Sequence, residues 1–179
     1  IILNRTVESE LISYLYTLNN IKIEFVKTEF AKDARYGKGL CSDFNLFEDK
    51  SPIIKKLETD LKEISKKALE KKEIIIHDSF FNIFTSGSGA TSSGATPHDH
   101  IGPQDENFGL KLYKYSLVYY LEIGDQSGQD PGILKLYNPD EDILPVNGMI
   151  VIIKAKQFHS VSYSGNKDRL MIGVNFYGF

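Results

Sequence analysis

Three of the four histidines in this sequence of 179 residues could bind one metal ion. His98 and His100 are separated by one residue, and side chains two positions apart in an extended chain point to the same side, while Asp99 between them points away. His159 follows much later in the sequence. Neutral imidazole binds iron, zinc and manganese, and three such ligands leave coordination positions open for other molecules. The alternative interpretation is a chance His-x-His pair at an exposed strand end.

The second half of the sequence, which carries these histidines, is expected to consist of short β-strands. β-branched and aromatic residues alternate there with turn signals such as Asn147-Gly148. We expect strands at residues 73–77, 80–85, 110–123, 132–137, 149–154, 158–163 and 169–179. Many short strands with regular turns favour a sandwich or jelly roll. The Gly- and Ser-rich residues 86–96 are expected to form a flexible loop or, alternatively, a mobile lid beside the histidines.

The first 72 residues are expected to cover this β core with helices. Apolar residues recur at helical spacing between residues 6 and 20, and again after Ser51-Pro52, which combines a capping serine with a proline at the first helical position. Residues 21–30 alternate as a half-buried strand would. We therefore expect a single, mainly β domain, in which residues 1–72 pack helices and one strand on the outside and residues 73–179 form the β core.

Alternation along the last expected strand separates two faces. The first face carries only apolar residues and should pack under helices or a second sheet: Leu170, Ile172, Val174 and Phe176. The second face carries Arg169, Met171, Gly173 and Asn175. Glycine leaves room and buried polar groups need partners, so we expect this face to be the wall of a polar cavity. His159 can face inward on the preceding strand. The alternative is that Arg169 and Asn175 face solvent.

Composition and charge argue against several classes of partner. The net charge is −3 and the charged residues are of mixed sign, so no basic patch for nucleic acid is expected. No run of about 18 apolar residues is available to span a bilayer, and we see no secretory leader pattern. Cys41 is the only cysteine, which excludes an internal disulfide and fits a reducing, cytoplasmic setting. An edge strand near residues 21–30 could pair between subunits, so a homodimer is left open.

Five motifs recur here in an order and spacing that are typical of one enzyme family. They are Pro97-His98-Asp99-His100, Ser116-Leu-Val-Tyr-Tyr-Leu121, Pro145-Val-Asn-Gly-Met-Ile-Val-Ile152, Phe158-His-Ser-Val161 and Arg169-Leu-Met-Ile-Gly-Val-Asn-Phe176. Together they resemble the 2-oxoglutarate/iron(II)-dependent oxygenases. The resemblance is to the prolyl-hydroxylase-like branch, and especially to small bacterial and phage proteins whose first motif reads His-x-His. It covers roughly residues 80–179.

The resemblance implies a double-stranded β-helix, which is a cupin-like jelly roll, and a hydroxylase-type dioxygenase that uses Fe(II), 2-oxoglutarate and O2, with ascorbate as a possible addition. By this resemblance His98 and His159 match the two histidine ligands of iron, and His100 falls at the third ligand position. Arg169 and Tyr120 match the groups that bind the distal carboxylate of 2-oxoglutarate. Asn175 falls near the iron and the substrate. No catalytic residue apart from the metal ligands is implied, and the substrate, a small molecule or a peptide, is not identified.

His100 departs from the family pattern, because most members carry Asp or Glu at this position. Three neutral histidines would leave the full 2+ charge on the iron(II) site, which favours anionic ligands. A bulge that turns Asp99 inward would be one way to supply a carboxylate. Two other functions stay open. One is a cupin-type metal enzyme, which would take Asp105 or Glu106 as a further ligand. The other is a non-catalytic jelly-roll domain that binds a metal or another ligand.

Overall fold

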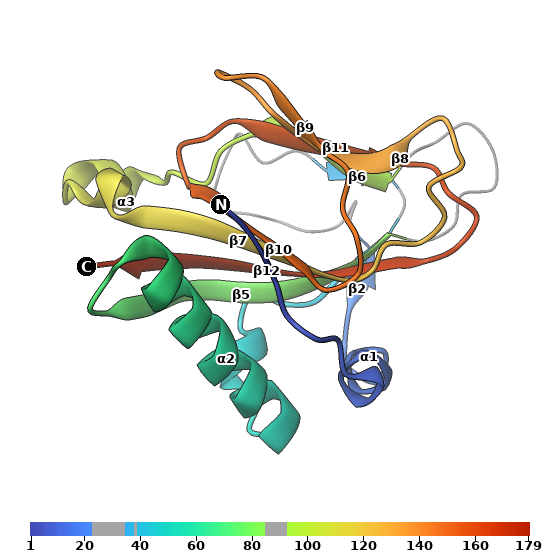
Figure 1. Ribbon diagram of the computed structural model, residues 1–179, viewed down its shortest axis with the longest axis horizontal. Helices are drawn as coiled ribbons and strands as arrows, with labels where there is room; N and C mark the ends of the chain where they lie inside the picture. Colours follow the sequence, from blue (N-terminus) through green and yellow to red (C-terminus); the bar gives the residue numbers. More distant parts are fainter. Residues whose placement is uncertain (23–34, 38, 85–92) are drawn as a thin grey trace.

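The computed structural model describes residues 1–22, 35–37, 39–84 and 93–179, and in them two antiparallel sheets face each other (Figure 1). The major sheet contains, in spatial order, β1 (Ile2–Asn4), β10 (Met149–Lys154), β7 (Lys114–Glu122), β12 (Arg169–Gly178), β5 (Ile74–Phe84), β4 (Leu40–Cys41) and β2 (Ile21–Lys22). The minor sheet contains β3 (Arg35–Gly37), β6 (Ser93–His98), β11 (His159–Tyr163), β8 (Pro131–Leu136) and β9 (Glu141–Ile143). This arrangement is the expected jelly roll.

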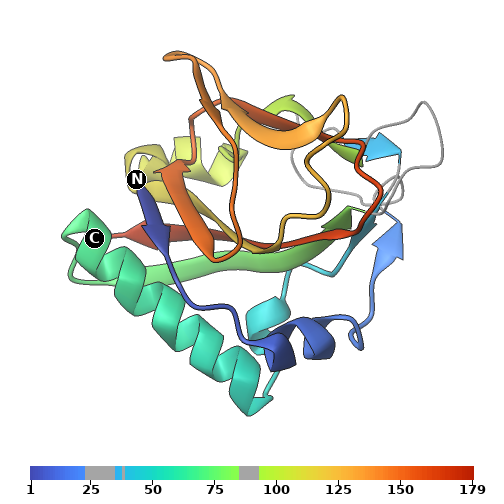
Figure 2. The ribbon, with the colours of Figure 1, turned by 45° about the vertical axis from the view of Figure 1, so that its right-hand side comes forward.

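Two helices lie against the outer face of the major sheet, α1 (Ser9–Leu15) and α2 (Pro52–Leu69), as Figure 2 shows from a second side. Leu11, Ile54 and Leu57 are fully buried there. They share a core with the outward row of β12, which is Leu170, Ile172, Val174 and Phe176. The predicted apolar face of the last strand is therefore confirmed. None of the described helices combines the length and the hydropathy that crossing a membrane would require.

The predicted start of the second helix is confirmed. Ser51 Oγ accepts a hydrogen bond from the backbone N–H of Ile54 at 3.4 Å, and Pro52 is the first helical residue. The serine therefore pairs one of the N–H groups that the first turn leaves without an intrahelical partner. The helix ends at Leu69, and the capping residue Glu70 adopts a left-handed conformation with φ of 53°.

Several strand predictions need correction. The strands expected at residues 73–77 and 80–85 form one strand, β5, which pairs along nearly its whole length with β12 and has an irregularity opposite Asn175 and Phe176. Residues 93–96 were expected in a loop but form β6 together with Pro97 and His98, because this segment pairs with β11 and β3. Only residues 21–22 of the strand expected at 21–30 are described, as β2. Residue 85 of the strand expected at 80–85 and residues 86–92 of the expected loop or lid lie outside the described residues.

Seven further elements of the described residues were not anticipated: β1, β3, β4, β9, α3 (Pro103–Asn107) and the short 3-10 helices η2 (Leu46–Glu48) and η3 (Leu110–Leu112). α3 and η3 occupy the chain between the histidines and β7, so the strand expected to begin at residue 110 begins at Lys114. A second core fills the space between the two sheets, with Phe80, Phe84 and Met171 from the major sheet and Leu134 and Val161 from the minor sheet. The three histidines lie in this space.

Candidate metal centre

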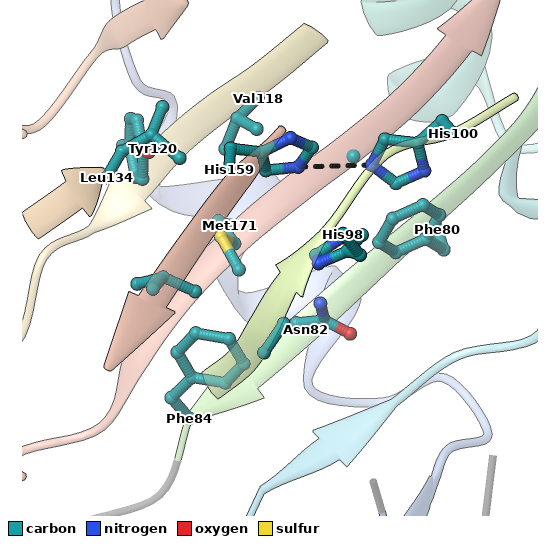
Figure 3. A pocket seen from close by; sticks show the side chains of 13 residues that line it. Phe80, Asn82, Phe84, His98, His100, Val118, Tyr120, Leu134, His159 and Met171 are labelled. Carbon is teal, nitrogen blue, oxygen red and sulfur yellow. Dashed lines mark hydrogen bonds between the residues drawn. The ribbon is translucent and has the colours of Figure 1, made fainter. Parts of the chain in front are cut away.

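His98, His100 and His159 converge between the two sheets, each offering one ring nitrogen within 4.8 Å of the other two (Figure 3). All three side chains are buried. The Nε2 atoms of His100 and His159 are 3.2 Å apart. Two nitrogens bound at 2.0–2.1 Å to one ion, at angles between octahedral and tetrahedral, would be about 2.8–3.4 Å apart. The observed separation therefore suits two ligands of the same ion.

Strand pairing brings two of the three histidines together. β6 and β11 are adjacent and antiparallel, and His98 is the register partner of His159. His100 lies two residues beyond the end of β6, where its backbone N–H donates to the carbonyl of Ala155 at 2.8 Å. The sequence argument placed His98 and His100 on one extended strand, and the structure brings them together although the strand has ended.

Backbone carbonyls fix the ring orientation of two histidines. His98 Nδ1 lies 2.6 Å from the carbonyl oxygen of Thr96, and His159 Nδ1 lies 2.8 Å from that of Gln157. A carbonyl oxygen only accepts, so each Nδ1 carries the hydrogen and donates it. The Nε2 atom of each neutral ring is left with a lone pair, which is the tautomer that a metal ligand needs.

Asp99 does not join the three histidines. Within the described part of the chain, the cluster of side chains that could hold a metal comprises the histidines alone. Asp99 Oδ1 instead accepts a hydrogen bond from the backbone N–H of Ile101 at 3.3 Å. The bulge that would bring this carboxylate inward is not seen.

The acids that a cupin site would require are also placed elsewhere. Asp105 is buried and its carboxylate accepts hydrogen bonds from Lys114 Nζ at 2.8 Å and Tyr177 Oη at 2.6 Å. Glu106 is exposed on α3. Neither belongs to the histidine cluster. The geometry therefore gives no support to a fourth, acidic protein ligand.

The cavity beside the histidines is mostly apolar. Figure 3 shows its walls, which are lined by Phe80, Asn82, Phe84, Ala95, His98, His100, Val118, Tyr120, Leu134, His159, Val161, Met171 and Gly173. Asn82 was not anticipated, although it shares strand parity with Phe80 and Phe84. Its side chain is 1% exposed, and its Oδ1 has no hydrogen-bond partner among the described residues. Such an orphaned acceptor in a cavity wall requires a donor from a bound molecule or water.

Arg169 lies at the first position of β12, opposite Phe84 of the cavity wall, and is fully buried. Its Nη1 donates to the carbonyl of Gly132 at 2.5 Å. Its Nε and Nη2 atoms have no hydrogen-bond partner in the described part of the chain. The guanidinium carbon lies 5.2 Å and 5.7 Å from the ring centres of Tyr120 and Tyr163. Burial lowers the pKa of the guanidinium from its ordinary value.

The two unpaired groups of Arg169 define what could bind there. Nε–H and one N–H of Nη2 point the same way and form a fork that matches both oxygens of a carboxylate. A buried cation without an anion costs several kcal/mol, on the order of 3–5. A carboxylate-bearing ligand would remove this penalty. The residues present at this end therefore fit a ligand that carries a carboxylate.

Asn175 faces inward, as its parity predicted, and is 4% exposed. Its Oδ1 accepts from Ser116 Oγ at 2.5 Å and its Nδ2 donates to Asp78 Oδ1 at 2.8 Å. Burial raises the pKa of the Asp78 carboxyl. Asn175 is not among the residues that line the cavity, so its assignment beside the substrate stays a prediction.

Comparison with solved structures identifies the fold. A member of the 2OG-Fe(II) oxygenase family from Burkholderia pseudomallei superposes with a TM-score of 0.64 at 11% identity, over 94% of this chain and 77% of that one. A prolyl hydroxylase from Trichoplax adhaerens, solved with a peptide fragment of the hypoxia inducible factor oxygen degradation domain, gives 0.63 at 14% identity, over 99% and 83%. The viral collagen prolyl hydroxylase of Paramecium Bursaria Chlorella virus-1, solved with 2OG, gives 0.60 at 12%, over 95% and 88%. No family model and no curated protein matches this sequence. The likeness establishes the fold that these enzymes share.

Proposed function

We propose that this protein is a 2-oxoglutarate- and Fe(II)-dependent dioxygenase. The observation that carries the proposal is the fully buried Arg169, whose Nε and Nη2 lack partners among the described residues. It lies behind a cavity wall that also carries three converging histidines. A cation that accepts one end of a dicarboxylate and a metal site that accepts the other are the two requirements for 2-oxoglutarate. The shared fold of the solved oxygenases supports the same function.

Each residue of the site has an assigned task. His98, His100 and His159 would hold Fe(II), and the fork of Arg169, with the hydroxyl of Tyr120, would bind the distal carboxylate of 2-oxoglutarate. Iron and 2-oxoglutarate supply the oxidising chemistry: O2 is consumed, 2-oxoglutarate is converted to succinate and CO2, and the substrate gains one oxygen atom. The substrate class stays open between a small molecule and a peptide.

The chain itself contributes orientation, charge and the exclusion of water. Hydrogen bonds to the carbonyls of Thr96 and Gln157 hold the rings of His98 and His159 in the tautomer that carries its hydrogen on Nδ1, so that Nε2 would be the metal-binding atom. Phe80, Phe84 and Met171 make the wall apolar, and a low local dielectric strengthens the attraction between Arg169 and a carboxylate. Because all three metal ligands are neutral, the site would keep a 2+ charge and favour anionic ligands.

The proposal is tested by adding Fe(II) and 2-oxoglutarate without oxygen. We expect the weak visible charge-transfer band of the chelate. His159→Ala should lose the band because iron is no longer held, whereas Arg169→Met should need a much higher concentration of 2-oxoglutarate to reach it. Absence of the band from the unmodified protein at saturating iron and 2-oxoglutarate would reject the proposal.

A second candidate is a non-catalytic domain that binds a metal and a carboxylate. The observation in its favour is His100, which occupies the position where a carboxylate is usual. Oxygen consumption and succinate release distinguish the two functions. Succinate formed above the level of the His159→Ala variant supports the oxygenase, and a normal chelate band without succinate, across a panel of small molecules and peptides, supports the binding domain.

A further inference from the structure

His100 is held differently from the other two histidines. His98 and His159 belong to paired strands of the minor sheet, so ladder hydrogen bonds fix their backbones. His100 lies beyond the end of β6 and before α3, in a segment without regular structure. Its position must therefore depend on other contacts of this segment.

A closed ring of interactions supplies these contacts. The backbone N–H of His100 donates to Ala155 O at 2.8 Å, and the N–H of Ala155 donates to Lys114 O at 3.0 Å. The ammonium group of Lys114 donates to Asp105 Oδ2 at 2.8 Å, and the same oxygen accepts from the N–H of Gly102 at 2.7 Å. Gly102 follows His100 by two residues, which closes the ring.

The ion pair in this ring is deeply buried. Lys114 and Asp105 each have 1% of their surface exposed. Tyr177 Oη donates to the second carboxylate oxygen at 2.6 Å, and the ammonium lies 5.6 Å from the centre of the Tyr177 ring. Burial raises the pKa of the Asp105 carboxyl, but the hydrogen bonds from Lys114, Tyr177 and Gly102 outweigh it and hold this pKa below its ordinary value. The carboxylate thus stays charged and keeps its partners in place.

We propose that the buried Asp105–Lys114 pair, together with Tyr177, is a positioning device for His100. None of these three side chains belongs to the metal cluster, yet metal affinity should depend on them because they hold the segment from His100 to Gly102. The inference rests on the metal-binding half of the proposed function. Substitutions of groups that orient metal ligands typically weaken metal binding about 10–100-fold.

The test is a double-mutant cycle on Co(II) affinity. The full chain is titrated with Co(II) as the only added ligand, and binding is measured from the visible absorption of the bound ion. Asp105→Asn keeps the size of the side chain but removes its charge, and we expect Co(II) to bind about tenfold more weakly. In the His100→Ala background the same substitution should cause no further weakening, because the histidine that it positions is gone. A merely structural role would weaken binding equally in both backgrounds.

Two further variants make the result specific. Glu58→Gln is the matched control, since Glu58 forms an ion pair of 2.7 Å with Lys62 on α2, away from the histidines, and it should leave Co(II) affinity unchanged. Tyr177→Phe removes one hydrogen bond to Asp105 and keeps the ion pair. It should weaken binding less than Asp105→Asn, and it serves in the same cycle if Asp105→Asn does not fold.

Three outcomes have distinct meanings. Weakening that disappears in the His100→Ala background supports the inference. Co(II) affinity that is unchanged in folded Asp105→Asn and Tyr177→Phe, or weakened equally in both backgrounds, overturns it while leaving the proposed oxygenase intact. An unmodified protein that binds no Co(II) overturns both.

Discussion

Lys114 and Arg169 are both buried cations on the inner face of the major sheet, yet only Lys114 has a carboxylate partner among the residues that the structure describes. Lys114 is 1% exposed and lies 2.8 Å from Asp105 Oδ2. Arg169 is 0% exposed, and two of its nitrogens have no hydrogen-bond partner. Each lies near tyrosine rings, so the aromatic surroundings do not distinguish them. The two sites differ in that a carboxylate of the described chain accompanies Lys114 but not Arg169.

This difference separates a structural charge from one that is suited to a ligand. A protein gains nothing in stability by burying a guanidinium without an anion, because its desolvation is not compensated. An unpaired buried cation behind a cavity wall is therefore best explained by a ligand that brings the missing charge. A buried cation with its own carboxylate is explained by the position that the pair gives to the surrounding chain.

The largest expected contrast concerns stability. Lys114→Met removes one partner of a buried pair and leaves Asp105 uncompensated, so we expect the free energy of unfolding to fall by about 3–5 kcal/mol. Arg169→Met removes a charge that has no carboxylate partner among the described residues, so the free energy of unfolding should stay the same or rise. Urea denaturation without ligands measures both. Equal losses in the two variants would break the comparison.

A double variant sharpens this contrast. Lys114→Met combined with Asp105→Leu removes both charges, and replacing a buried ion pair by apolar residues is often neutral or stabilising. The double variant should therefore regain most of the stability that Lys114→Met loses. A double variant as unstable as the single one would show that packing, and not the unpaired carboxylate, is responsible.

The next expected effect concerns a dicarboxylate. 2-Oxoglutarate at 100 times its dissociation constant, with Co(II) present, should raise the free energy of unfolding by about 2.7 kcal/mol. Arg169→Met should abolish most of this gain, and Arg169→Lys should restore it only in part, because an ammonium lacks the planar fork. Glu58→Gln should keep the full gain.

A ligand without the distal carboxylate provides the control. 2-Oxopentanoate has the same keto acid end, so it should stabilise the unmodified protein less than 2-oxoglutarate does. Arg169→Met should respond to the two ligands alike. A preference for 2-oxoglutarate that survives in Arg169→Met would place the distal carboxylate somewhere else.

The surroundings of Arg169 could be predicted from the sequence better than the surroundings of Lys114. Alternation along one strand was enough to turn Arg169, Met171 and Gly173 inward, because strand parity is a local property. Met171 and Gly173 do line the cavity. Asn82 follows the same rule within the strand expected at residues 80–85, but it was not singled out as a site residue. In addition, β5 was expected as two short strands. Its pairing with β12 is what makes it continuous, and that partner is almost 90 residues away.

The ring around His100 could not be predicted from the sequence. Asp105 and Lys114 have the residue types of a solvated surface, and charged residues are seldom buried without a partner. Their surroundings come from distant parts of the chain, since Tyr177 of β12 donates to Asp105 of α3 across 72 residues of sequence. No local pattern encodes such a contact. The same holds for β6, whose strand conformation depends on β11.

The smallest expected effect is a pH dependence of stability to which the carboxylate beside Lys114 contributes and Arg169 does not. The pKa of Asp105 is held below its ordinary value in the folded protein, so its charge stabilises the fold above the unfolded pKa of about 3.9, and this contribution is lost as the pH falls through the folded pKa. Asp105→Asn should therefore show a flatter loss of stability on acidification, although it is less stable at neutral pH.

Asp78 acts in the opposite sense, because burial raises its pKa and its contribution to stability is lost as the pH rises. Arg169 does not titrate in this range, so Arg169→Met should keep the slope of the unmodified protein between pH 5 and pH 3, which urea denaturation at each pH would measure. A slope unchanged in Asp105→Asn would mean that the carboxylate is not held charged by Lys114.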